Sequence, residues 1–166
     1  QNHTISLNIN NEYSEAGLFG YLVNKSSISN LNVTGNVKGA NTGGIAIYVE
    51  YASIENCSFT GNVTAVRNGN DSNYENVNDY DRIIFAGGIL GSALNDEANI
   101  ISCKFSGNVR TIFSMNNEDD EEIYSAFAGG IAGYVEYGGT ILSCDVINGS
   151  NVSADVSLYN NYDCEI

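Results

Sequence analysis

The stretch that decides the fold reads Thr42-Gly-Gly-Ile-Ala-Ile-Tyr48, then Ser53-Ile-Glu-Asn-Cys-Ser-Phe59, then Gly61-Asn-Val63. Its apolar residues alternate with small or polar ones, which is the period of a β-strand and not that of a helix. Ile54 and Cys57 are three residues apart, so both can face the same side only if the chain turns at Glu55-Asn56. The stretch therefore predicts short strands joined by corners.

The same blocks recur along the chain in four copies, at approximately 16–37, 42–63, 86–109 and 128–152. The step from Ile28 to Ile54 is 26 residues, but the next equivalents, Ile100 and Ile141, follow after 46 and 41 residues. The excess falls both times between a Gly-Asn-Val block and the next Gly-Gly-Ile block, which predicts insertions at 64–85 and 110–127. A short polar residue suited to a tight bend occupies the corner of every copy: Asn30, Asn56, Ser102 and Ser143.

One copy cannot bury its own apolar face, whereas stacked copies can. The repeats therefore predict an all-β fold, a right-handed parallel β-helix or solenoid of about four coils with two inserted loops. We expect a single domain over residues 1–166.

The repeated blocks resemble the GLUG repeat of bacterial and other microbial surface proteins, including repeats beside the IgA-peptidase catalytic domains of Gram-positive bacteria. Gly17-Leu-Phe-Gly-Tyr21 carries the resemblance most clearly, and it extends over roughly residues 3–153. Ile47, where the other copies have glycine, and the two acidic insertions depart from the pattern. The resemblance implies a β-solenoid in a secreted or wall-attached protein, without catalytic machinery, so we expect an extracellular or cell-surface location.

Composition narrows the classes of partner. Twenty acidic residues against six basic ones give a formal net charge of −14, which repels phosphate backbones and anionic lipid headgroups. No stretch reaches the ~20 consecutive apolar residues that a membrane span needs. We therefore expect neither nucleic-acid binding nor membrane insertion, and the expected partners are further copies of the chain, other surface proteins or glycans.

The sequence offers no catalytic constellation. His3 is the only histidine, and no nucleophile motif surrounds it, so we assign no catalytic residue and expect no enzyme activity and no cofactor. Glu50, Glu55 and Glu97 could supply paired carboxylates for glycoside hydrolysis, but nothing in the sequence places two of them across a cleft. Acidic residues at 71–81 and 118–122 could attract calcium, yet they lack the spacing of known calcium loops, which favours solvated loops and no metal site.

Cys57, Cys103 and Cys144 hold the same repeat position, which predicts a ladder of thiols stacked in the core. Parallel stacked side chains give poor disulfide geometry, so free thiols are favoured there. Cys164 could bridge to Cys144 in an oxidising compartment.

Two further sets of residues allow more than one interpretation. Tyr21, Tyr48 and Tyr134 follow the Gly-x-x-Gly blocks, and they predict either a stacked aromatic ladder that supports packing or a row of glycan-stacking platforms. Asn-x-Ser/Thr sequons give candidate glycosylation sites at Asn2, Asn24, Asn32, Asn62, Asn70, Asn148 and Asn151.

The favoured function is a non-catalytic extracellular structural or adhesive repeat protein that assembles end to end into a surface filament or stalk. Two alternatives remain: a glycan-binding adhesin module, and a polysaccharide-degrading β-helix enzyme.

Overall fold

The computed structural model describes residues 3–11, 13–68, 83–94, 97–116, 125–135 and 139–159. These residues form strands and connecting turns, with no helix among them, and hence none that could span a membrane. The strands are β1 (His3–Asn11), β2 (Phe19–Leu22), β3 (Ser27–Ser29), β4 (Leu31–Gly39), β5 (Thr42–Gly43), β6 (Ala46–Val49), β7 (Ser53–Glu55), β8 (Ser58–Asn68), β9 (Ile83–Gly87), β10 (Leu90–Ala93), β11 (Asn99–Ile101), β12 (Lys104–Asn116), β13 (Ser125–Gly129), β14 (Ala132–Val135), β15 (Thr140–Leu142), β16 (Asp145–Val146) and β17 (Asn151–Tyr159).

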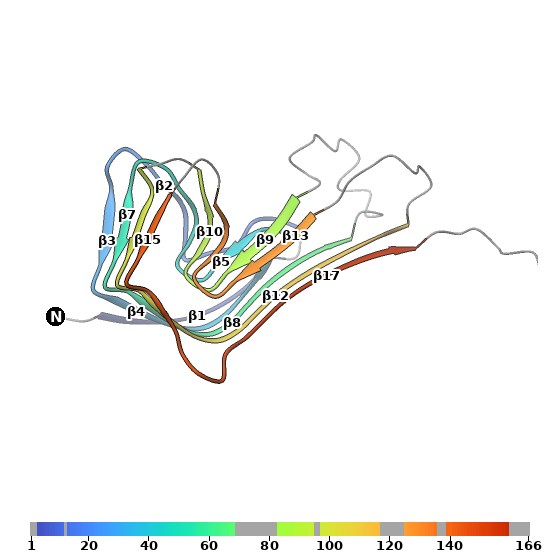
Figure 1. Ribbon diagram of the computed structural model, residues 1–166. Helices are drawn as coiled ribbons and strands as arrows, with labels where there is room; N and C mark the ends of the chain where they lie inside the picture. The colour runs from blue at the N-terminus through green and yellow to red at the C-terminus, as the bar shows by residue number, and fades with distance from the viewer. Residues whose placement is uncertain are drawn as a thin grey trace, which may run out of the picture.

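These strands form four parallel sheets. One sheet has the order β1-β4-β8-β12, with β16 and β17 both paired to β12, and the others run β2-β6-β10-β14, β3-β7-β11-β15 and β5-β9-β13. Neighbours in each sheet come from successive repeat copies, because the chain visits the sheets in turn (Figure 1). The predicted all-β parallel solenoid is confirmed, while its handedness and the number of its coils stay predictions.

The repeat positions lie in register across the sheets. Ile28 pairs with Ile54, Ile54 with Ile100, and Ile100 with Ile141. Each corner residue is left-handed: Asn30, Asn56, Ser102 and Ser143 have φ between 51° and 57°. Asn tolerates that conformation better than most residues, and both types form local hydrogen bonds at bends, so the predicted corners are confirmed.

The core is a stack of equivalent apolar side chains. Ile54 and Ile100 are fully buried, as are Phe59 and Phe105, whose rings stack 6.3 Å apart at 13°. A Cβ on Gly88 would lie 2.4 Å from the Phe105 ring, so the second glycine of the Gly-Gly-Ile block leaves the space that the ring fills. The glycine-rich block and the aromatic position therefore form one packing unit.

Strands continue into both segments where the sequence predicts insertions. β8 extends to Asn68, β9 begins at Ile83, β12 extends to Asn116 and β13 begins at Ser125. The strands extend because inward and outward side chains keep alternating: Val109, Thr111 and Phe113 are all buried along β12. The sheets therefore include residues 64–68, 83–85, 110–116 and 125–127. The segments outside the sheets are shorter than the predicted insertions of 64–85 and 110–127. Residues 69–82 and 117–124 lie outside the described part.

The fourth copy departs from the register between β16 and β17. Phe105 pairs with Val146 and Asn108 with Asn151, so four residues, 147–150, stand opposite the two residues 106–107. This bulge leaves the sheet as the red loop at the bottom of Figure 1. Its Ser150 Oγ accepts a hydrogen bond from the Gly107 amide at 3.1 Å, which ties the bulge to the preceding strand.

Candidate functional site

The three candidate glycan-stacking tyrosines belong to a packed aromatic row. The Tyr21 and Tyr48 rings stack with centroids 4.5 Å apart, and the Phe85 ring lies 5.6 Å from Tyr48 and 6.4 Å from Tyr134. In the third copy the register position of these tyrosines is Ser92, and Phe85 of the neighbouring sheet contributes the ring instead. Each of the three tyrosine rings stacks on one other ring, which favours the packing interpretation over sugar stacking, although Tyr21 is 58% exposed.

The Glu15 carboxylate contacts one ring of this row. The Tyr48 hydroxyl donates a hydrogen bond to Glu15 Oε1. Burial, followed by this hydrogen bond and the nearby Glu15 charge, raises the pKa of Tyr48 well above its ordinary value. Burial and the same carboxylate also raise the pKa of Tyr21. Tyr21 and Tyr48 are therefore neutral phenols at physiological pH.

A small cavity of about 120 Å³ lies beside the row, lined by Tyr48, Phe85, Ser92, Tyr134 and their neighbours. Ser92 is 1% exposed, and its Oγ has no hydrogen-bond partner within the described residues. The space is too small for a saccharide unit, so it is a packing defect at the position where the tyrosine is missing.

The three repeat cysteines lie along one inner corner. Cys57 and Cys103 are buried, Cys144 is half-buried, and no disulfide joins any two of the three. Each Sγ points at a carbonyl of the preceding copy: Cys103 Sγ lies 3.5 Å from the Ile54 oxygen and Cys144 Sγ lies 3.4 Å from the Ile100 oxygen. Cys164 lies outside the described residues, so its bridge to Cys144 stays a prediction.

The Cys57 and Cys103 thiols shift each other's pKa in opposite directions. A hydrogen bond from Cys103 lowers the pKa of the Cys57 thiol, because it stabilises the Cys57 thiolate. The same contact, together with burial, raises the pKa of Cys103. Both groups are covered by neighbouring coils, which suits packing and not reaction with solutes.

The outer face of the long sheet carries a ladder of asparagine amides. Asn62 Nδ2 donates to Asn36 Oδ1 at 2.8 Å, Asn108 Nδ2 to Asn62 Oδ1 at 2.7 Å, and Asn151 Nδ2 to Asn108 Oδ1 at 2.9 Å. Asn8 continues the same row by its register with Asn36. The ladder joins all the copies on the solvent side, as stacked asparagines do in cross-β arrays.

The candidate glycosylation sites differ in environment. Asn24, Asn62, Asn148 and Asn151 are exposed, Asn32 is half-buried, and Asn2 and Asn70 lie outside the described residues. Asn62 and Asn151 use their amide nitrogens in the ladder. Modification would leave each of these nitrogens a single N–H and would place a glycan directly on the ladder.

Other candidate groups are scattered. Glu50 and Glu55 are half-buried and Glu97 is exposed. Within the described ranges, no cluster of three or more histidine, cysteine or carboxylate side chains is placed to hold a metal ion. The acidic segments 71–81 and 118–122 lie outside those ranges.

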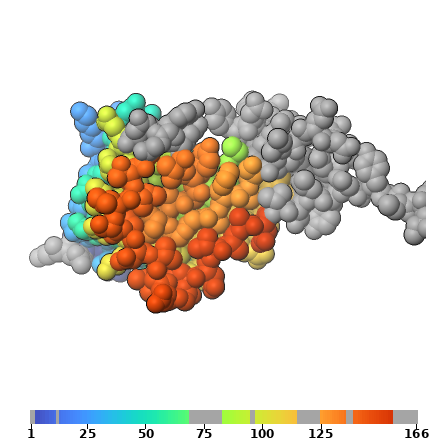
Figure 2. Space-filling model, in the orientation of Figure 1, coloured from blue at the N-terminus to red at the C-terminus, as the bar shows by residue number. Residues whose placement is uncertain are grey.

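The two ends of the stack expose apolar residues that are buried in the middle. Ile54 and Ile100 are 0% exposed, but their equivalent Ile141 in the last copy is 44% exposed. Figure 2 shows this face, formed by the orange and red residues of the fourth copy. At the other end, Ile5 of β1 is 36% exposed. Within the described residues, β2 and β3 end their sheets on one side and β14 and β15 on the other.

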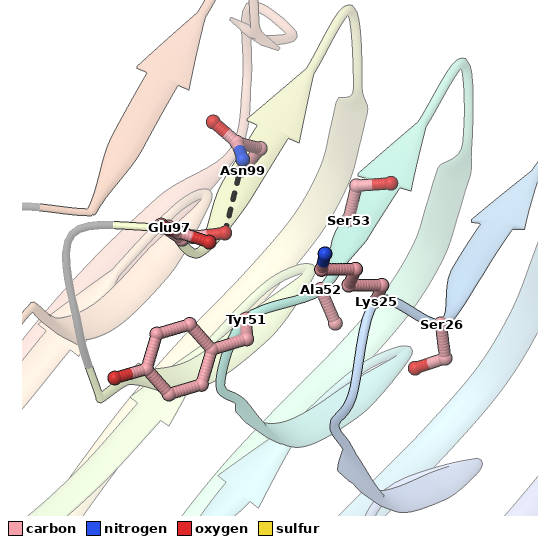
Figure 3. Close-up of a pocket in the computed structure, with 7 residues that line it drawn as sticks. All are labelled: Lys25, Ser26, Tyr51, Ala52, Ser53, Glu97 and Asn99. Carbon is pink, nitrogen blue, oxygen red and sulfur yellow. Dashed lines mark hydrogen bonds between the residues drawn. The ribbon is translucent and has the colours of Figure 1, made fainter.

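An open hollow of about 410 Å³ lies at the corner between the sheets of β6 and β7. Figure 3 shows its lining: Lys25, Ser26, Tyr51, Ala52, Ser53, Glu97 and Asn99. Sequence analysis did not single out this corner. The available signal was that Lys25, Tyr51 and Glu97 each stand three residues before the equivalent isoleucine of their copy.

Comparison with protein families matches residues 39–64 to the GLUG motif. Those residues comprise β5, β6, β7 and the first part of β8, which is one passage around all four sheets. Comparisons with curated proteins and with solved structures gave no match. The matched segment contains the second repeat copy, so the chain carries a GLUG motif within its β-solenoid fold.

Proposed function

We propose that this solenoid is a non-catalytic structural and adhesive module of an extracellular or cell-surface protein, and that copies of it associate end to end. The observation that carries the proposal is the pair of open ends. Ile141 is 44% exposed at a position where the inner copies bury isoleucine completely. Full burial of such a side chain is worth about 1.5–3 kcal/mol, so covering the part of Ile141 that is still exposed would contribute about 1 kcal/mol and favour a covered end over an open one.

Geometry favours another copy of the chain as the cover. Among the described strands, those at the two ends have one unpaired edge each: β2 and β3 at one end match β14 and β15 at the other, sheet for sheet. A second copy would continue the parallel pairing that already joins β10 to β14 and β11 to β15. Such a head-to-tail contact does not close, so it produces filaments or stalks.

Sedimentation of the chain over a concentration series tests the assembly. We expect the average mass to rise with concentration. Ile141→Lys places a charge in the apolar end and should leave a monomer, whereas Leu142→Lys, on the outward side of the same strand β15, should associate like wild type. A monodisperse monomer at the highest concentration, or equal behaviour of the two variants, would contradict the proposal.

The alternatives receive less support. The contacts of Tyr48 and Tyr134 with neighbouring rings favour packing over glycan stacking at those residues. A polysaccharide-degrading enzyme would need two carboxylates that face each other across one groove. Neither of the two hollows described above is lined by two described carboxylates.

A further inference from the structure

The corner hollow brings together three chain segments from successive copies. The Lys25 amide donates to the Tyr51 carbonyl at 2.6 Å, the Ser53 amide to the Ser26 carbonyl at 3.0 Å, and the Asn99 amide to the Ala52 carbonyl at 3.0 Å. These bonds set Lys25, Tyr51 and Glu97 in a row across the coils. The row is therefore held by backbone pairing, and its side chains project from a rigid support.

Tyr51 lies at a corner where the backbone is left-handed in two successive copies. Its φ is 50°, and Lys25, the equivalent residue of the first copy, has a φ of 63°. The corner of the repeat therefore sets this conformation, which turns the Tyr51 side chain outward from the coil. The Tyr51 side chain is 49% exposed and lines the hollow.

The polar side chains that line the hollow beside the Tyr51 ring include neutral, acidic and basic groups. Asn99 Nδ2 donates to the Glu97 carbonyl at 3.0 Å, which fixes the orientation of the amide (Figure 3). Ser26 and Ser53 contribute hydroxyls, and the Glu97 carboxylate and the Lys25 ammonium belong to segments about 10 Å apart, two strand spacings. The lining thus offers an aromatic face, donors and acceptors, and one charge of each sign.

This combination suits a neutral polyhydroxylated ring. The face of a tyrosine packs against the C–H face of a pyranose, while the amide, carboxylate, ammonium and hydroxyl groups bond to its hydroxyls. The hollow has the size of ordinary ligand sites, which begin at about 300 Å³. The net charge of −14 disfavours an anionic sugar. We propose that this corner binds one neutral pyranose unit of a glycan, with Tyr51 as the stacking platform. The site would add a ligand to the surface module and is independent of end-to-end assembly.

Saturation-transfer NMR on the full chain tests the site, with methyl glucoside, galactoside, mannoside and N-acetylglucosaminide as probes and methyl glucuronide as the anionic comparison. We expect at least one neutral pyranoside to bind with a Kd of about 1 mM, the affinity typical of a ligand of this size. Tyr51→Asn should weaken binding about tenfold without lowering the melting temperature, because Asn accepts a positive φ. Tyr51→Phe should bind within about twofold of wild type, since it keeps the ring.

Tyr13→Ala is the matched control, because Tyr13 is an exposed tyrosine outside the hollow. It should bind like wild type. The proposal is overturned if none of the four neutral probes binds at about ten times that Kd, or if Tyr51→Asn binds as well as wild type. Tighter binding of the glucuronide than of every neutral probe would refute the neutral class of ligand.

Discussion

Gly61→Ala should be among the most damaging single substitutions in this chain. Gly61 has a φ of +142°, and an added Cβ would lie 1.8 Å from the Gly35 carbonyl oxygen of the adjacent strand. The backbone conformation alone costs about 1–3 kcal/mol for a residue with a side chain. Relief of the clash requires β4 and β8 to separate locally, which sacrifices two or three ladder bonds worth about 1 kcal/mol each. The expected loss is about 3–6 kcal/mol.

Urea unfolding followed by circular dichroism measures this loss, and two other glycines separate its causes. Gly149→Ala has φ +90° but no atom within 4 Å of the added Cβ, so it should show the conformational cost alone. Gly20→Ala meets neither obstacle and should be neutral or slightly stabilising. If Gly61→Ala loses no more stability than Gly149→Ala, the close contact between successive copies is not as described.

Three smaller effects follow from the side-chain environments. Ser92→Ala should stabilise the fold by about 1 kcal/mol, since it removes a buried hydroxyl without a described partner; a lower unfolding free energy would contradict this. Because the pKa of Tyr48 is raised in the folded state, its contribution to stability is present below pH 10 and declines as the pH rises above 10. In thermal melts, Tyr48→Phe should therefore lose less melting temperature than wild type as the pH rises above 10. An equal dependence of melting temperature on pH in the two proteins would refute the assignment. Asn62→Asp puts a carboxylate acceptor against Asn36 Oδ1 and should lower the unfolding free energy by about 1 kcal/mol at pH 7. Part of that loss should be recovered near pH 3, where the carboxyl is protonated and can donate. A loss that does not change with pH would count against the amide ladder.

The stacking could be predicted from the sequence because it depends on periodicity. Ile54, Ile100 and Ile141 recur at one position of the repeat, and the period of two fixes which side chains face inward. The corner at Asn56 followed from a three-residue interval between two inward residues, and its positive φ agrees with that interval. Information repeated in four copies is therefore sufficient to set the register.

Contacts between different sheets could not be predicted in this way. Phe85 lies in β9, yet its ring occupies the aromatic row opposite Ser92 of β10, and a repeat alignment compares equivalent positions only. The corner hollow was missed for a related reason: Lys25, Tyr51 and Glu97 are equivalent by position but chemically different, so they leave no repeated signal. Irregular positions within a repeat were the least accessible to sequence reasoning.

The stacked register is tested most directly by measuring the distance between spin labels at Asn8 and Asn151. The labels are attached to unnatural amino acids at these two positions, so that the native cysteines stay unlabelled. These residues stand in one row across β1, β4, β8, β12 and β17. Four strand spacings put their backbones about 19 Å apart, although the residues are far apart in the sequence. A narrow distribution near 20 Å is the expected result. A broad distribution, or a mean beyond about 35 Å, would contradict the solenoid.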